Sequence, residues 1–420
     1  MTDAAETVAP DAPSIPLLLE LTPMNEAYRT DTHAMLDVLR THAPVRHDPM
    51  AGSMILSRYA DVRAVVNDRT LWRDPLRANE DAVLQRRFSA NVDPNLPRTS
   101  TTSILMLDEP DHGRVRQPLA QALYARVAKF KPEVERIIGE TLDAVAGEDT
   151  FDLMDRFCVP IPIDVIASIL GVDHARLSDF RAWSEGVIQG LNPLRNPDQT
   201  RAMEEASLAL TAYFTEAMAD RRREPRDDLI SDMVQLQAGG ADLSDDELRI
   251  NLTALLVGGN LTTTDLIGNG VRLLLTNPEA LARFKADPTT VNALVEEVLR
   301  HDPPVDITGR IVSDEREIAG CPMHQGQSIT VSLRAANRDP AVYEDPHRFD
   351  PSRKHKPHVA FGGGAHICIG APLARLEAQV ALVRLFERFP DLALAEPDAA
   401  PEWRQLPFFR GLERLPVRVR

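Results

Sequence analysis

The stretch FGGGAHICIG, residues 361–370, holds one cysteine, Cys368, shortly before a long amphipathic segment that predicts a helix. A sulfur at a helix N-terminus lies near free backbone N–H groups and the positive end of the helix dipole, and both favour the thiolate. The three preceding glycines permit a tight turn that brings further N–H groups towards the sulfur. The pattern therefore predicts a single thiolate held at the start of a helix.

One thiolate presented by a glycine loop suits axial ligation of haem iron, where it pushes electron density onto the metal. The alternative is an inert buried cysteine, the usual state of a free Cys. Cys158 and Cys321 have no run of glycines before them, so both are interpreted as packing or turn residues. The 11 histidines contain no H-x-x-x-H or H-E-x-x-H pattern, and the sequence indicates no second metal site.

The segment resembles the haem-binding signature of cytochrome P-450 monooxygenases, Phe-x-x-Gly-x-x-x-Cys-x-Gly, with Phe361, Gly364, Cys368 and Gly370 at its fixed positions. Other stretches match the family in order, from about residue 30 to the end: DEPDHGRVRQ, EEVLR, ANRDP, FDPSR and RGLERLPVRV. The resemblance implies a bacterial member of the family. It also implies a mainly α fold with small β-sheets, with haem between a long central helix and the helix after Cys368.

Composition agrees with an intracellular protein. The 420 residues carry a net charge of −16, which argues against nucleic acid as a partner. Three cysteines make no disulfide framework and suit a reducing cytoplasm. The N-terminus lacks a basic region, and its apolar run IPLLLEL is too short for a signal peptide or a membrane span. We expect a cytoplasmic monomer without membrane insertion, in which residues 1–20 form a flexible leader and residues 21–420 one domain.

The expected cofactor is haem b, whose two propionates need charged or hydrogen-bonding partners when they are buried. The resemblance assigns this role to four residues: His112, Arg116, Arg310 and His366. A lone arginine is normally a solvated surface side chain, and only the match to the family positions favours the ligand interpretation.

Glu297 and Arg300 lie three residues apart in EEVLR, so they share a helix face and can form an ion pair. A surface pair of this kind contributes under about 1 kcal/mol to stability. The resemblance instead implies a buried structural pair that locks the following meander near Arg338 beneath the haem.

The central helix is predicted to start at Ser244, where SDDE forms a capping box with Glu247, and to run to about Leu275. Its middle contains the poor helix formers GGNLTTTD, residues 258–265. The resemblance implies that this stretch faces the bound dioxygen. Gly258 and Gly259 are expected to provide room and local unwinding, and the Thr262 hydroxyl to bond the oxygen.

Leu261 stands where the family usually has an acid, and a leucine cannot relay a proton. Asp265, one helical turn further on, is a candidate substitute, with Asn260 and Thr263 as other polar candidates. The alternative is that Asp265 is a structural residue contacting a neighbouring helix. Leu261 is also compatible with direct use of peroxide, or with chemistry that needs no acid.

The resemblance implies a monooxygenase that inserts one atom of O2 into a small or medium hydrophobic compound, by hydroxylation or epoxidation. The chain has no flavin or nicotinamide fingerprint and no four-cysteine cluster, so electrons must come from an external ferredoxin and its reductase. A basic docking patch is predicted from Arg114, Arg126, Lys129, Lys131, Arg353, Lys354, Lys356 and Arg375. A non-catalytic haem sensor is the alternative from another functional class.

The resemblance places the substrate pocket between the 72–103 loop, helices near 174–200, the central helix, residues 305–308 and the segment near Phe408 and Phe409. These segments are mostly aliphatic, but the loop also contains Arg73, Arg77, Arg86 and Arg87. Solvation is the default interpretation of these arginines, and a carboxylate-bearing substrate is the alternative.

Overall fold

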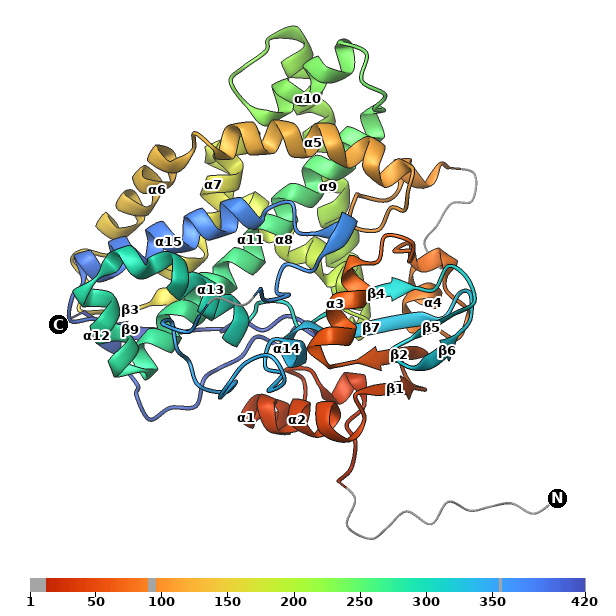
Figure 1. The fold of residues 1–420 in the computed structure, drawn as a ribbon. Coiled ribbons are helices and arrows are strands. Elements are labelled where there is room, and N and C mark those ends of the chain that lie inside the picture. Colours follow the sequence, from red (N-terminus) through yellow and green to blue (C-terminus); the bar gives the residue numbers. More distant parts are fainter. Residues whose placement is uncertain (1–12, 90–95, 355–356, 420) are drawn as a thin grey trace.

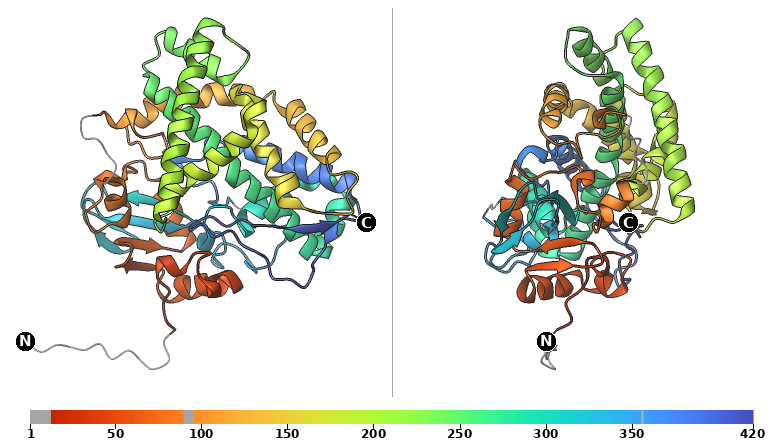
Figure 2. Two further views of the ribbon diagram at one scale, coloured as in Figure 1. Left: turned by 180° about the vertical axis from the view of Figure 1, so that it is seen from behind. Right: turned by 90° about the vertical axis from the view of Figure 1, so that its right-hand side faces the viewer.

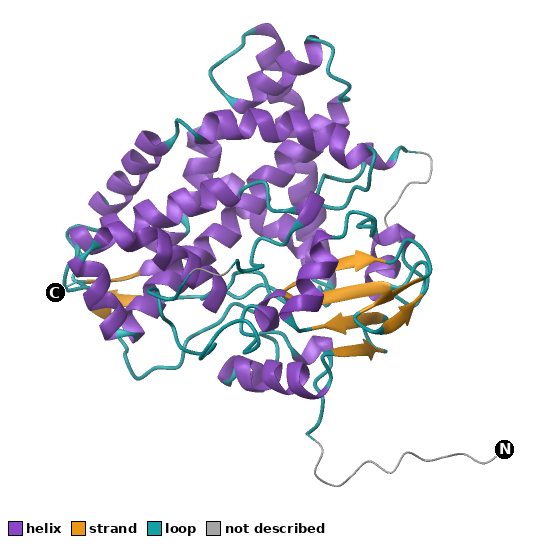
Figure 3. Ribbon diagram, viewed as in Figure 1, coloured by secondary structure: helices purple, strands orange, loops and turns teal. Residues whose placement is uncertain are grey.

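Helices dominate the computed structural model, which describes residues 13–89, 96–354 and 357–419 (Figure 3). The longer helices are α2 (Thr32–His42), α5 (Asp111–Val127), α6 (Lys131–Asp143), α7 (Pro160–Leu170), α8 (Leu177–Ile188), α9 (Pro197–Arg223), α10 (Leu229–Ala238), α11 (Asp245–Thr276), α13 (Val291–His301) and α15 (Ala371–Arg388). The shorter ones are α1 (Glu26–Thr30), α3 (Tyr59–Asn67), α4 (Val83–Ser89), α12 (Pro278–Ala286) and α14 (Leu333–Ala336).

Helix α11 crosses the middle of the helical part, with α7, α8, α13 and α15 around it (Figure 1). Its start confirms the predicted capping box, because the Ser244 N–H donates to Glu247 Oε2 at 2.7 Å and the Glu247 N–H to Ser244 Oγ at 3.2 Å. The helix has 32 residues, so it spans about 48 Å. The expected unwinding at Gly258 and Gly259 is not present, since the segment is one continuous α-helix.

A four-stranded sheet lies at one side of the helices. Its order is β1 (Val45–Asp48), β2 (Ser53–Leu56), β7 (Ser328–Ser332) and β4 (Ile307–Ile311). Strands β1 and β2 form an antiparallel hairpin, β2 and β7 run parallel, and β7 and β4 run antiparallel. This pairing fixes β4, which carries Thr308 and Arg310 on the same face.

Two smaller sheets complete the described strands. One joins β3 (Thr150–Asp152), β9 (Pro416–Arg418) and β8 (Ala393–Leu394), and the other pairs β5 (Arg316–Ile318) with β6 (Cys321–Met323). The mainly α fold with small β-sheets is therefore confirmed.

The largest buried apolar cluster draws residues from Ile104 to Val417 into one core. Helix α7 is almost wholly buried in it, which agrees with its nearly continuous apolar sequence PIPIDVIASIL. Helices α8 and α9 are joined by residues 189–196, and α9 runs along the outside of the molecule (Figure 2). Within the described ranges, no helix combines the length and apolar character needed to cross a bilayer.

A flexible leader was expected over residues 1–20. Residues 1–12 of it lie outside the described residues. Its remaining part is held by contacts: the Leu18 N–H donates to Asp48 Oδ2 at 2.6 Å, and Arg46 donates to the Ile15 carbonyl at 2.9 Å. Leu18 is itself buried. The packed part of the chain therefore includes Ile15 and Leu18, before the expected boundary at residue 21.

Candidate functional site

Two glycines in the loop before Cys368 have backbone conformations that other residues rarely adopt. Gly362 and Gly364 have φ angles of +69° and +61°, in the left-handed region that side chains disfavour. A Cβ on Gly364 would lie 2.7 Å from the Val66 carbonyl oxygen at the end of α3. The Gly364 N–H donates to Asn67 Oδ1 at 3.0 Å, and the Cys368 N–H to the Phe361 carbonyl at 3.0 Å. The loop is thus closed on itself and pinned to α3.

Cys368 lies three residues before the first residue of α15, as its sequence context predicts. Its side chain is exposed, although protein surrounds it at short range. That enclosure raises the pKa of the Cys368 thiol, while the N–H groups of Gly370 and Ala371 and the charge of Arg116 lower it. The thiol is therefore accessible and has the donors that would stabilise its thiolate.

The four residues predicted to hold the propionates come together. The rings of His112 and His366 lie 4.1 Å apart, and Arg116 donates to the carbonyl of Ile367, the residue before Cys368. Burial, followed by the positive groups of His112, Arg73, Arg310 and Arg116, lowers the pKa of His366 to about 2. A strongly positive region therefore adjoins the cysteine loop.

Arg73 is a fifth member of this region, although it was interpreted from the sequence as a solvated arginine of the 72–103 loop. Its Nη1 donates to the Gly309 carbonyl at 2.6 Å and to Thr308 Oγ1 at 2.7 Å. Arg310 donates to the same Gly309 carbonyl at 2.8 Å and to the Val66 carbonyl at 3.1 Å. Burial and the neighbouring Arg310 lower the pKa of Arg73 to about 9, and burial lowers that of Arg310 to about 10.

These cations suit an anionic group. Among the described residues, neither Arg73 nor Arg310 forms an ion pair with a carboxylate, although Arg310 is only 4% exposed. His112 Nε2 is buried and has no hydrogen-bond partner there either. Enclosed positive charges without anions are costly, so the region fits the two propionates of haem.

In the middle of α11, Gly258 is exposed and Thr262, one helical turn further on, is half-buried. A Cβ on Gly258 would meet no heavy atom within 4 Å, whereas one on Gly259 would lie 3.7 Å from Ile166 of α7. Thr262 Oγ1 donates to the Gly258 carbonyl at 2.8 Å, and Leu261 is half-buried. The space beside Gly258 is therefore open, and Gly259 packs against α7.

Asp265 occupies a different environment. It is fully buried and forms an ion pair with Arg404 at 2.9 Å. A Cβ on Gly411 would lie 1.8 Å from Asp265 Oδ1, so the C-terminal segment closes over the carboxylate. Burial raises the pKa of Asp265, and Arg404 opposes this effect. The geometry favours the structural alternative, with the contact made to the C-terminal segment rather than to a helix.

Glu297 and Arg300 form a buried two-contact ion pair, with both contacts at 2.7 Å. Arg300 also donates to the carbonyls of Asn337 and Pro346, at 3.0 and 2.9 Å, and thereby holds the meander. Arg338 instead donates to the His301 carbonyl, at 2.7 Å from Nη2.

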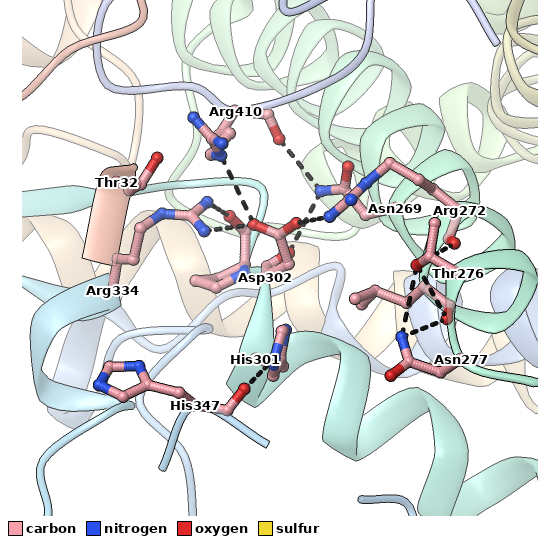
Figure 4. Close-up of polar contacts among 12 residues, drawn as sticks. Thr32, Asn269, Arg272, Thr276, Asn277, His301, Asp302, Arg334, His347 and Arg410 are labelled. Atoms are coloured by element: carbon pink, nitrogen blue, oxygen red, sulfur yellow. Dashed lines mark hydrogen bonds and ion pairs between the residues drawn. The ribbon is translucent and has the colours of Figure 1, made fainter. Parts of the chain in front are cut away.

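A further ionic cluster around Asp302 was not predicted from the sequence. Figure 4 shows the guanidinium groups of Arg334, Arg272 and Arg410 converging on this carboxylate. Burial alone would raise the pKa of Asp302, but these charges hold it well below its usual range. The cluster joins the end of α13 to α11, α14 and the C-terminal segment, so its role is structural.

The predicted docking patch is largely neutralised. Arg114, Arg126, Lys131 and Arg375 form ion pairs with Glu247, Asp232, Glu135 and Glu296. Arg375 also lies over the ring of Phe361 at 4.6 Å. Lys129 and Lys354 are exposed, and Lys356 lies outside the described residues.

Comparisons with known proteins show which proteins the chain is similar to. The family model described as Cytochrome P450 matches residues 192–401. Cytochrome P450 107B1 of Saccharopolyspora erythraea is 37% identical over 95% of this chain and 98% of its own length. The 6-deoxyerythronolide B hydroxylase of the same organism is 34% identical over 94% of this chain and 98% of its own.

A solved structure shows the same fold. Myxobacterial cytochrome P450 CYP267B1 in complex with myristic acid has a TM-score of 0.84 and 32% identity, over 94% of this chain and 98% of that one. The protein is a monooxygenase that binds haem b. With its cysteine loop, positive region and central helix, the chain belongs to the bacterial cytochrome P450 family.

Proposed function

We propose that this chain hydroxylates or epoxidises a small or medium hydrophobic organic compound, with electrons from an iron–sulfur ferredoxin and its reductase. The observation that carries the proposal is the accessible Cys368 beside a largely enclosed positive region, whose arginines form no ion pair with a carboxylate of the described residues. Cys368 would bind the iron, and His112, Arg116, Arg310 and His366 would hold the propionates. When bound, haem supplies the binding and activation of O2.

The chain's own groups then organise the reaction. The N–H groups of Gly370 and Ala371 favour the thiolate form of Cys368. Gly258 leaves room above the site, and Thr262 Oγ1 is the hydroxyl on the same face of α11. A rotation about χ1 would release this hydroxyl from the Gly258 carbonyl, so that it could hold or pass a proton.

Proton supply to Thr262 depends on the residues around it in α11. Leu261 is apolar, and a relay through Asp265 would require Arg404 to release the carboxylate. We therefore infer that Asp265 positions α11 and that Thr262 receives protons from water. Leu261 also favours a second candidate, a peroxide-driven enzyme, because such an enzyme needs no proton delivery during oxygen activation.

Two measurements test the proposal. The reduced, carbon-monoxide-bound protein should show the absorption band diagnostic of thiolate ligation, and Cys368→Ala should abolish it. Products should then form with a surrogate ferredoxin system, NADPH and O2. Fast peroxide-driven turnover with no detectable ferredoxin-driven turnover would contradict the proposal and support the second candidate.

A further inference from the structure

Two arginines meet where α4 contacts the connection between α8 and α9. Arg87 is in the last turn of α4, and its Nη2 donates to the backbone carbonyl of Arg195 at 3.4 Å. Both side chains are half-buried. The two segments belong to those that the family resemblance assigns to the substrate pocket.

The guanidinium groups of this pair are poorly satisfied. The Nε atoms of Arg87 and Arg195 are both buried and have no hydrogen-bond partner among the described residues. Arg195 Nη1 makes only long contacts, 3.4 Å to the Gly190 carbonyl and 3.5 Å to the Asn192 carbonyl. Neither arginine forms an ion pair with a carboxylate in the described part of the chain.

The charges of the two arginines also act on each other. Burial and the charge of Arg87 lower the pKa of Arg195, while the carboxylate of Glu204 opposes them from α9. Two partly desolvated like charges repel, and an anion placed between them would relieve the repulsion and supply hydrogen-bond acceptors.

Other arginines of the same region differ from this pair. Arg77 pairs with Asp108 at 3.1 Å, and Arg98 pairs with Asp74 at 2.9 Å. Arg86, next to Arg87 in sequence, is exposed and donates to the carbonyls of Glu80 and Asp81. Within the described ranges, the unmet donors are therefore a property of Arg87 and Arg195, and not of every arginine in this loop.

Apolar side chains accompany the pair. Leu84 is one helical turn before Arg87 on α4 and is 43% exposed, and Leu194 precedes Arg195 and is 45% exposed. A charged group beside exposed leucines suits a ligand that has an anionic head and an apolar body.

We propose that Arg87 and Arg195 together bind the carboxylate of an amphipathic organic acid, such as a medium- or long-chain fatty acid, as the substrate class of this enzyme. The inference rests on the proposed function and specifies its hydrophobic substrate. It agrees with the solved relative CYP267B1, which was crystallised with myristic acid. Because the arginines come from two segments, a bound carboxylate would also tie α4 to the α8–α9 connection.

The test compares an acid with its neutral counterpart. Dodecanoate and dodecan-1-ol are titrated into the haem-loaded protein, and binding is followed by the change in the haem absorption spectrum and by calorimetry. Arg87→Gln and Arg195→Gln should each weaken dodecanoate binding by about tenfold or more. Dodecan-1-ol binding should change by less than about twofold, because the alcohol makes no charge-assisted contact. Raising the salt concentration should weaken the binding of dodecanoate and leave the binding of dodecan-1-ol unchanged.

Arg86→Gln is the matched control, and it should leave the binding of both ligands unchanged. The proposal is overturned if the two substitutions affect acid and alcohol equally, if Arg86→Gln has the same effect, or if the wild-type protein binds no dodecanoate. These outcomes leave the proposed function intact as long as the thiolate band is present and a neutral substrate is oxidised. Loss of the band would reject the proposed function itself.

Discussion

Gly364 shows how a single residue secures the cysteine loop. Its φ of +61° and the 2.7 Å approach of an added Cβ to the Val66 carbonyl leave no place for a side chain. A turn with this backbone, pinned to α3 through Asn67, determines where Cys368 lies. Loop geometry and haem ligation are therefore expected to fail together.

Gly364→Ala should destabilise the protein by about 1–3 kcal/mol, because alanine must adopt a left-handed conformation and displace α3. The variant should also purify with less haem. Urea unfolding and the ratio of haem absorbance to protein measure the two effects. Gly147→Ala is the control, since a Cβ there would meet no heavy atom within 4 Å. Equal behaviour of the two variants would contradict this account.

Thr262 is the residue on which oxygen chemistry is expected to depend. Thr262→Ala should lower the yield of product per electron consumed by about 10²-fold, because no other hydroxyl of this helix turn shares the face of Gly258. Substrate affinity should remain unchanged. The yield is measured as product formed against NADPH oxidised.

The control for Thr262→Ala is Thr264→Val. The Thr264 hydroxyl is buried and has no hydrogen-bond partner in the described residues, so its removal should preserve the yield. A loss of yield in Thr264→Val as large as in Thr262→Ala would point to general damage to α11.

Restoring an acidic side chain at position 261 tests whether proton supply limits turnover. If proton supply limits turnover, Leu261→Asp should raise the product yield per electron by about tenfold or more, because it places a titratable group next to Thr262. Leu261→Asn is the control of equal size without a titratable proton. An unchanged yield in Leu261→Asp would show that water alone supplies the protons at sufficient rate.

At the scale of elements, α15 contains a buried carboxyl group that forms no ion pair with any described residue. Glu377 is 2% exposed, and its Oε2 lacks a hydrogen-bond partner among the described residues. Burial raises the pKa of Glu377 well above its ordinary value. The folded state thus binds a proton that the unfolded chain releases above about pH 4.3.

The raised pKa of Glu377 makes the protein less stable at higher pH. Because the folded state binds more protons, the free energy of unfolding falls as pH rises above the ordinary glutamate pKa. The fall is up to about 1.4 kcal/mol per pH unit, and it ends where Glu377 ionises in the folded state. Glu377→Gln has no carboxyl group at this position and should not lose stability in this way. The variant should therefore gain stability relative to wild type between pH 5 and 7.5, as measured by urea unfolding. Glu387→Gln, an exposed position on the same helix, should follow wild type at both pH values, and a pH-independent difference for Glu377→Gln would refute the argument.

Local sequence signals predicted two of the helices that frame the site. The start of α11 was predicted from its capping box, and α15 begins shortly after Cys368, as predicted. Helix α4 was missed, because its seven residues lie in a stretch rich in Pro, Asn and Arg that has little periodicity.

The candidate site was only partly predictable from the sequence. A signature fixes residues close in sequence, such as Gly364 and Cys368. The partner of Asp265 is 139 residues away, and only the folded chain brings Arg404 to it. The involvement of Arg73 likewise depends on how its loop packs against β4. Long-range pairing of this kind leaves no local pattern.

Across the whole molecule, positive side chains cluster at particular places although the net charge is strongly negative. The net charge is −16, yet Arg73, Arg116 and Arg310 gather beside the cysteine loop, and Arg87 and Arg195 meet at α4. Acidic side chains neutralise most other arginines at the surface. Anionic groups of cofactor and substrate are therefore expected to bind where buried or half-buried arginines form no ion pair with a described carboxylate.

Among the described members of the predicted patch, the same reasoning narrows the proposed ferredoxin contact to Lys129 and Lys354. Both are exposed, whereas the arginines of the patch and Lys131 are already paired with carboxylates. Lys129→Glu and Lys354→Glu should slow reduction by an acidic ferredoxin by about tenfold at low salt and flatten its salt dependence. Stopped-flow reduction at several ionic strengths measures both effects.

Arg388→Glu, at the far end of α15 from Cys368, is the matched charge reversal. It changes the net charge by the same amount, so it separates a local contact from the field of the whole molecule. Docking at the two lysines requires that Arg388→Glu reduce the rate less than either lysine variant. If all three variants slow reduction equally, net charge governs the encounter; if none does, the ferredoxin binds elsewhere.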